Sequence, residues 1–146
     1  MNNKIIDTLN GLLADAHILN VKLHNYHWNI QGSQFFPIHE LTEKYYDYFF
    51  GVYDDVAERV LQLGGKPLAS TKAYLEATKL DEEEGNAFTP EQVLKAVLAD
   101  FETMHKTALE IMGLCDEASD ISTGNMIGGM VDWLEKAMWM LRQTLN

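Results

Sequence analysis

The feature that most constrains this chain is its apolar residues, which recur at alternating spacings of three and four. Such spacing places side chains on one face of an α-helix, because the helix turns once in about 3.6 residues. Four long stretches have this spacing, at 5–23, 38–63, 94–115 and 127–145. No stretch has the strict alternation typical of a half-buried β-strand. The sequence therefore predicts an all-α fold in which four long helices bury one face each.

The ends of these helices predict how they are connected. Residues 64–67 (Gly-Gly-Lys-Pro) end the second helix, because glycine favours helix termination and proline cannot continue a helix. Residues 89–92 (Thr-Pro-Glu-Gln) open the third helix as a capping box. The first two helices are joined by a short turn, whereas the connection 64–88 can return along a bundle and holds a short helix predicted at 70–78. We therefore predict a four-helix bundle with one long crossover, in a single domain spanning residues 1–146.

The charge balance disfavours nucleic acid as a partner. The chain has 22 Asp and Glu residues against 11 Lys and Arg, which gives a formal net charge of −11. Nucleic-acid binding depends on clustered basic side chains that displace counterions from phosphates. A surplus of carboxylates instead suits hard cations, although it also serves solubility.

The sequence also predicts the compartment. No apolar run reaches the roughly 18 residues that a membrane span requires. Residues 1–4 lead into an amphipathic pattern rather than an apolar signal segment. Cys115 is the only cysteine, so no disulfide can form within the chain, and we expect it in the core. We therefore predict a cytoplasmic protein without a membrane partner.

Four candidate metal ligands lie on one side of the second predicted helix. His39 and Glu43 are one turn apart, and so are Asp54 and Glu58. At about 1.5 Å per residue, the two pairs are separated by about 16 Å along the helix axis. Metal–ligand bonds are only about 2 Å long. One copy of this helix therefore cannot bring all four residues to one ion.

A second copy of the same helix, placed antiparallel across a two-fold axis, removes this difficulty. The axis is expected near Tyr48 and Phe49, within the aromatic-rich segment 45–53, because interfaces favour aromatic residues. His27 joins the set from the end of the first helix, on an adjacent antiparallel element. Imidazole and carboxylate ligands suit iron and would also accept zinc or manganese. The predicted site combines His27, His39 and Glu43 of one chain with Asp54 and Glu58 of its partner.

Several segments resemble the motifs of the Dps family of mini-ferritins. Residues 23–32 (LHNYHWNIQG) are similar to the motif of its first helix, and residues 35–43 (FFPIHELTE) and 54–65 (DDVAERVLQLGG) to those of its second. Residues 73–76 (AYLE) and 139–142 (WMLR) also fit, so the resemblance covers nearly the whole chain. It implies a ferritin-like four-helix bundle, twelve copies of which form a hollow shell built from two-fold dimers.

The resemblance implies a function for this shell. Family members oxidise Fe(II) to Fe(III), preferably with hydrogen peroxide, at di-iron sites shared between two subunits. They store the ferric mineral inside the shell and so protect against oxidative damage. Glu43 is a mild departure, because many members have Asp at that position. The family's ligand positions fall on the residues already selected: His27, His39, Glu43, Asp54 and Glu58.

The resemblance also implies roles for residues outside this ligand set. Trp28 matches a family aromatic beside the site that can act as a radical sink, although its plainer role is packing. Iron commonly enters through acidic pores at the three-fold axes, near the start of the last helix. Asp116 and Asp120 are the candidates for such a pore, and Glu117 is a weaker one. The plainer role of these carboxylates is that of solvated loop residues.

Two alternatives to this function stay open. The first is a DNA-compacting protein of the Dps type, but DNA-binding members carry a basic tail, and here Lys4 is the only basic residue before Lys22. The second is a conventional di-iron protein with its site inside one subunit. Such bundles use two Glu-x-x-His motifs, and this chain has one, at Glu102 and His105. We therefore expect no DNA binding at ordinary salt and no metal at His105.

Overall fold

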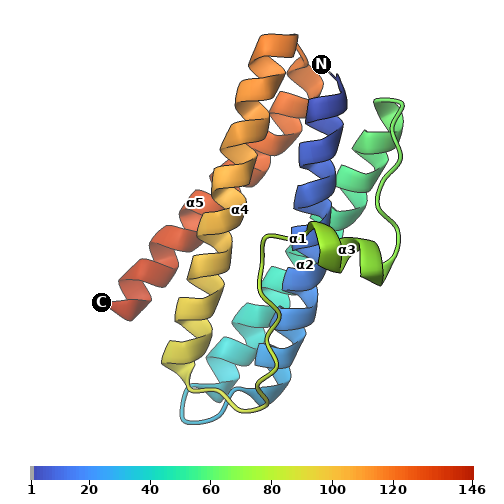
Figure 1. Ribbon diagram of the computed structural model, residues 1–146. Helices are drawn as coiled ribbons and strands as arrows, with labels where there is room; N and C mark the ends of the chain where they lie inside the picture. Colours follow the sequence, from blue (N-terminus) through green and yellow to red (C-terminus); the bar gives the residue numbers. More distant parts are fainter. Residues whose placement is uncertain (1) are drawn as a thin grey trace.

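The computed structural model describes residues 2–146, whose regular secondary structure is helical. Within these residues there is no β-strand, only one isolated bridge between Ile30 and Phe88. None of the helices combines the length and the apolar character that crossing a membrane requires. The prediction of an all-α fold is confirmed. The helices are α1 (Asn2–Asn29), α2 (Phe35–Gln62), α3 (Thr71–Ala77), α4 (Pro90–Ala118) and α5 (Ile121–Leu145) (Figure 1).

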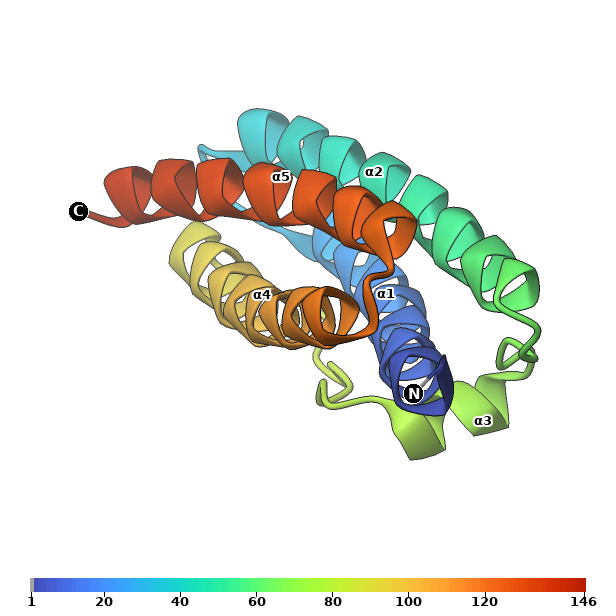
Figure 2. The same cartoon turned by 90° about the horizontal axis from the view of Figure 1, so that it is seen from above.

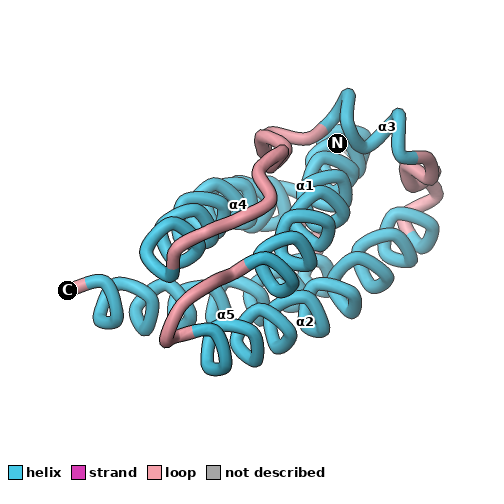
Figure 3. The backbone as a smooth tube through the Cα atoms, turned by 90° about the horizontal axis from the view of Figure 1, so that it is seen from below, coloured by secondary structure: helices cyan, strands magenta, loops and turns pink. Residues whose placement is uncertain are grey.

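The four long helices form the predicted bundle, and the short α3 belongs to the crossover. α1 packs against both α2 and α4, and α4 packs against α5. The crossover from α2 to α4 passes outside α1, where α3 lies (Figure 2). Short turns join α1 to α2 and α4 to α5, whereas longer loops flank α3 (Figure 3). The ferritin-like bundle with a short helix in its crossover is confirmed.

The helix ends follow the signals in the sequence. The Thr89 hydroxyl accepts a hydrogen bond from the Gln92 N–H at 3.2 Å, and the Gln92 side chain accepts one from the Thr89 N–H at 2.9 Å. The predicted capping box is therefore present. Ser70 caps α3 in a similar way, accepting from the Ala73 N–H at 3.2 Å. Directly after α2, Gly64 has a φ of +86°, which glycine adopts without strain.

The core forms where the apolar stripes of the helices meet. At its centre Phe49 of α2 and Phe101 of α4 are fully buried. The Trp133 ring of α5 lies 5.4 Å from Phe49 and 5.6 Å from Phe101, so three helices contribute to one aromatic cluster. Burying each such side chain contributes about 1.5–3 kcal/mol. Cys115 is also buried, as its position in the apolar stripe predicts.

A buried polar group ties the crossover to the bundle. Asp15 of α1 is fully buried, and its Oδ1 accepts hydrogen bonds from the Thr78 hydroxyl at 2.7 Å and the Lys79 N–H at 2.8 Å. The Lys79 Nζ donates to Thr107 of α4 at 3.2 Å. Burial raises the pKa of Asp15, because the charged carboxylate loses its hydration, although the bonds from Thr78 and Lys79 oppose the shift.

Candidate metal centre

The turn between α1 and α2 brings two histidines together. His27 lies in the last turn of α1, and His39 lies in the second turn of α2. Gly32 allows the reversal between them with a φ of +110°, a conformation that favours glycine. The Phe35 N–H then donates to the Gly32 carbonyl at 3.0 Å. As a result, the His27 and His39 rings stack with their centroids 3.6 Å apart.

Each of the two imidazoles donates a hydrogen bond to the main chain of the other residue. The His27 Nδ1 lies 2.6 Å from the His39 carbonyl oxygen, and the His39 Nδ1 lies 2.7 Å from the His27 carbonyl oxygen. A carbonyl oxygen can only accept, so both Nδ1 atoms carry the proton. In a neutral ring Nε2 then keeps its lone pair, which is the form that binds a metal. The main chain therefore holds both side chains in the ligating tautomer.

Burial favours the neutral form of His27. Its side chain is almost entirely buried, and burial lowers the pKa of His27 below its usual value of 6.5, because the imidazolium loses hydration. The bond to the His39 carbonyl and the charge of Glu43 oppose the shift without reversing it. A metal ion at neutral pH therefore does not have to displace a proton from this ring.

Glu43 extends this histidine pair by one helical turn. Its Oε1 lies 4.0 Å from the His27 Nε2, and its side chain is 56% exposed. Two imidazoles and one carboxylate are a donor set that non-haem Fe(II) accepts with coordination positions left open. The Tyr46 hydroxyl donates to the same Oε1 at 3.4 Å, and Thr42 places its hydroxyl 3.2 Å from the His27 Nδ1. Neither was predicted from the sequence, although each lies three residues after a predicted ligand.

The remaining predicted ligands lie near the other end of α2. Asp54, Asp55 and Glu58 are exposed, and each offers a ligand atom within 4.8 Å of the other two. Asp55 was not predicted. Because α2 is one continuous helix, Asp54 lies about 16 Å along the axis from Glu43 at about 1.5 Å per residue. The structure therefore gathers the predicted ligands into two groups and does not join these groups within one chain.

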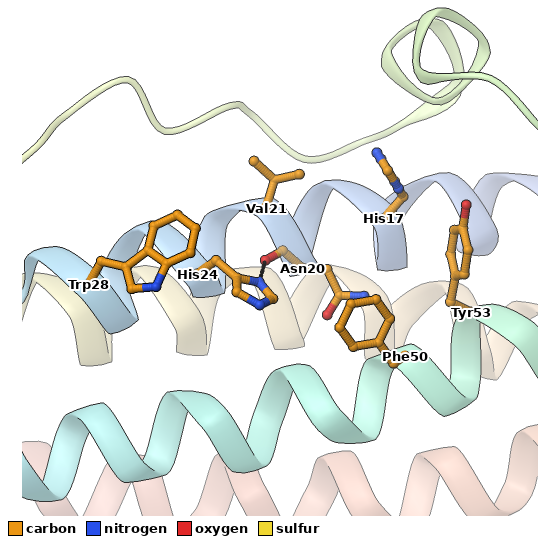
Figure 4. Close-up of a pocket in the computed structure, with 7 residues that line it drawn as sticks. All are labelled: His17, Asn20, Val21, His24, Trp28, Phe50 and Tyr53. Carbon is orange, nitrogen blue, oxygen red and sulfur yellow. Dashed lines mark hydrogen bonds between the residues drawn. The ribbon is translucent and has the colours of Figure 1, made fainter.

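An apolar surface separates the two groups on the outer side of α1 and α2. The most exposed side chains on it are Val21 at 59%, Trp28 at 66% and Phe50 at 53%. A groove with a cavity of about 280 Å³ runs between them (Figure 4). An exposed apolar patch of this kind is typical of a protein interface. The groove is lined by His17, Asn20, Val21, His24, Trp28, Phe50 and Tyr53.

The two-fold axis is predicted at the midpoint of α2, near Tyr48 and Phe49, and the structure shows which aromatic side chains face outward there. Phe49 is fully buried within its own bundle. The Tyr48 ring stacks on Trp133 of α5 at 3.9 Å. Phe50 lines the groove instead, and the Tyr46 ring lies 6.4 Å from it. The aromatic run continues around the helix, so its position along the axis did not identify the outward side.

The candidates outside the ligand set have distinct surroundings. Trp28 is exposed and its ring lies 5.5 Å from that of His24. Asp116 is exposed near the end of α4. Asp120 caps α5 by accepting from Thr123, and it pairs with Arg59 at 3.1 Å. Although burial acts in the opposite direction, these hydrogen bonds and the guanidinium lower the pKa of Asp120. Its carboxylate is therefore engaged within the chain.

The single Glu-x-x-His motif contributes to helix packing. The His105 Nε2 lies 2.8 Å from a carboxylate oxygen of Glu135, which joins α4 to α5. Glu102 is exposed. Among residues 2–146, the cluster of possible metal ligands formed by Asp54, Asp55 and Glu58 includes neither Glu102 nor His105.

Comparison with known proteins decides the family. Residues 6–146 match the ferritin-like domain family. The "DNA protection during starvation protein 2" of Bacillus anthracis is 38% identical over 146 residues, which cover 100% of this chain and 99% of that protein. The chain belongs to the Dps family of ferritin-like proteins. The sequence resemblance and the ferritin-like bundle thus agree.

Solved structures of Dps proteins have the same fold. The Dps protein from Bacillus brevis superposes with a TM-score of 0.95 at 34% identity, covering 97% of that chain and 99% of this one. The Dps protein from Vibrio cholerae O1 superposes with a TM-score of 0.96 at 29% identity, covering 91% and 99% respectively. The latter is described as a member of a superfamily of ferritin-like diiron-carboxylate proteins. A role in iron binding and storage fits this family and this fold.

Proposed function

We propose that this Dps protein oxidises Fe(II) at sites shared between two copies of the chain and stores the ferric product. The observation that supports this best is the division of the ligand set along α2. Oriented imidazoles lie at one end of the helix and a carboxylate group at the other, with an exposed apolar surface between them. The proposed ligands are His27, His39 and Glu43 of one chain with Asp54 and Glu58 of its partner.

A two-fold pairing of the outer faces of α1 and α2 completes the site. With the two α2 helices antiparallel, the His27 end of one chain meets the Asp54 end of the other. The symmetry axis repeats the contact, so each pair forms two identical sites. Val21, Trp28 and Phe50 would be covered, and burying apolar area contributes about 25 cal/mol per Å².

The proposed chemistry follows from the donor set. Neutral imidazoles accept Fe(II), and the carboxylates stabilise the higher charge of Fe(III). Hydrogen peroxide needs two electrons, and two neighbouring Fe(II) ions supply one each. Peroxide is therefore consumed without release of hydroxyl radical, which is why we propose it as the preferred oxidant. The ferric ions then hydrolyse and collect as mineral inside a shell of twelve copies.

The entrance for iron is proposed at the acidic junction between α4 and α5. Asp116 is exposed there and free to attract Fe(II). Asp120 also lies at this junction, but its carboxylate already accepts a hydrogen bond from Thr123 and pairs with Arg59. Asp116 is therefore the stronger candidate for attracting iron, and Asp120 stabilises the start of α5.

Removal of the histidines tests the proposal. Replacing both His27 and His39 by Gly is expected to slow rapid Fe(II) oxidation by roughly tenfold or more, because two oriented ligands are lost. The measurements are anaerobic Fe(II) titration followed by peroxide addition, with particle mass recorded alongside. We expect an assembled particle of unchanged mass that binds less Fe(II). An oxidation rate equal to that of the wild type would rule out this site.

The relatives named for DNA protection favour a second function, DNA compaction. Twelve copies at a net charge of −11 would carry roughly −130, which repels phosphate strongly. A gel-shift experiment at low salt separates the two functions. We expect no shift of DNA by the wild-type shell, and a clear shift would favour compaction.

A further inference from the structure

Two histidines outside the proposed iron site line the groove on the outer side of α1 and α2. His17 and His24 both belong to α1 (Figure 4). They are seven residues apart in the sequence, which is about 10 Å along the helix at about 1.5 Å per residue. Metal–nitrogen bonds are only about 2 Å long. The two rings of one chain therefore cannot bind the same ion.

The His24 ring is held in the tautomer that binds a metal. Its Nδ1 lies 2.7 Å from the Asn20 carbonyl oxygen, which can only accept a hydrogen bond. Nδ1 therefore carries the proton, and the Nε2 of the neutral ring keeps its lone pair. The ring also stacks on Tyr46, with centroids 3.9 Å apart, which fixes its orientation. A main-chain carbonyl thus orients this ring, as it does those of His27 and His39.

The His17 ring is neutral at pH 7. It packs against Tyr74 of α3, with ring centroids 4.5 Å apart. Burial lowers the pKa of His17 below its usual value of 6.5, because the imidazolium loses hydration. A metal ion that reaches this ring therefore does not have to displace a charge-bearing proton.

Ring contacts fix the register between α1 and α2. The His24 ring stacks on Tyr46, and the His17 ring lies 5.7 Å from that of Tyr53. In both contacts the two residue numbers total 70, because the helices run antiparallel. The ligands proposed on α2 are centred between residues 48 and 49. A two-fold axis through that point, perpendicular to both helices, therefore crosses α1 between residues 21 and 22.

This axis brings His17 opposite His24 of the partner subunit. Rotation about it lays α1 antiparallel on α1 of the second copy, as it does for α2. His17 and His24 are centred between residues 20 and 21, within about 1.5 Å of the axis along the helix. Each histidine therefore faces the other one in the second copy. The symmetry repeats the contact, so a pair of chains contains two of them.

We propose that His17 and the partner's His24 bind one Zn(II) ion, in a second metal site within the two-fold interface. The inference rests on the pairing of the proposed function, but it uses none of the iron ligands. Imidazole nitrogen is a preferred ligand of zinc, and water completes the four-coordinate ion. Zn(II) has no redox chemistry, so this ion joins the two chains and takes no part in iron oxidation.

Zinc binding by assembled particles tests this site. The background carries His27→Gly and His39→Gly, so that its iron site retains no imidazole. We expect about one tightly bound Zn(II) per chain by equilibrium dialysis, because each pair of chains forms two sites. Adding either His17→Ala or His24→Ala should weaken this binding at least tenfold, since both residues hold the same ion. Particle mass is recorded throughout, and His17→Gln replaces His17→Ala if the latter does not assemble.

His105→Ala is the matched control, because His105 pairs with Glu135 and does not line the groove. It should leave zinc binding unchanged. A background variant that binds no zinc, or zinc binding that His17→Ala leaves unchanged, would overturn the second site. Anaerobic Fe(II) titration of the wild type separates this outcome from failure of the proposed function. Normal Fe(II) binding without His17-dependent zinc refutes only the second site, whereas His17-dependent zinc without Fe(II) binding refutes only the iron site.

Discussion

The contact between His27 and His39 shows how single residues prepare this site before any metal arrives. Each ring is fixed by the other residue's carbonyl, at 2.6 and 2.7 Å. A His ligand is usually oriented by a separate second residue. Here each ligand is oriented by the main chain of the other, so replacing one side chain removes its own bond and the ring stacking but leaves the carbonyl that holds the other ring.

Asp15 is a residue whose effect on stability depends on pH. Its folded pKa is raised above the usual 3.8 by burial, so its stabilising contribution is complete below pH 3.8 and is lost as pH rises through the raised value. Asp15→Asn keeps an oxygen acceptor for Thr78 and Lys79 but does not ionise. The variant should therefore gain stability relative to the wild type as pH rises above 3.8.

Urea unfolding at several pH values measures this difference. Asp7→Asn is the control, since Asp7 lies on the same helix but is exposed. It gives the effect of replacing a carboxylate that is not buried. If the difference between wild type and Asp15→Asn did not vary with pH, Asp15 would not carry the burial cost assigned to it.

At the level of elements, the helices could be predicted from the sequence because apolar spacing and caps act locally. The short helix predicted at 70–78 is observed as Thr71–Ala77, and the capping box at Thr89 is present. Tyr48 and Phe49 lie at the midpoint of α2, where the two-fold axis is predicted, but their side chains pack within the chain and Phe50 lines the outer groove. Which side of an aromatic run faces the core depends on neighbours distant in sequence, here Trp133.

The site was predictable in its residue types but not in its contacts. Spacing along α2 identified His39, Glu43, Asp54 and Glu58 as two groups, and the structure keeps them apart as two groups. The exchange of carbonyl bonds between His27 and His39 requires the exact turn at Gly32, which no spacing rule specifies. Helical geometry could have indicated Tyr46, because it lies one turn after Glu43. The contact between its ring and that of His27 is seen only in the structure.

The turn between α1 and α2 depends on glycine. Gly32→Ala should lower the free energy of unfolding by about 1 kcal/mol or more, because alanine is strained at a φ of +110°. The same change should weaken Fe(II) binding, since the turn positions both histidines. Chemical denaturation and anaerobic titration measure these two effects.

Gly11→Ala is the opposite control, at a glycine inside α1 rather than in the turn. Gly11 lies in the interior of α1, and an added methyl group would meet no atom within 4 Å. Alanine is favoured over glycine in a helix by about 0.5–1 kcal/mol. This variant should therefore be more stable than the wild type with unchanged Fe(II) binding. A Gly32→Ala variant as stable as the wild type would contradict the role of the turn.

At the scale of the whole molecule, the chain presents half of a site at each end of one helix. The groove between these halves is lined by both α1 and α2 (Figure 4), so a partner must contact both helices to bring the halves together. Function is therefore proposed to be a property of the pair, and mutations at opposite ends of α2 should have the same effect.

Co-assembly of two inactive variants tests this sharing most directly. One variant lacks His27 and His39, and the other has Ala at Asp54 and Glu58. In each mixed pair one site contains all five intact ligands and the other retains only Glu43. Random mixing makes half of the pairs mixed, so about a quarter of the wild-type rate of rapid Fe(II) oxidation should return. No recovery beyond the sum of the separate variants, in particles shown by mass to contain both chains, would contradict a shared site.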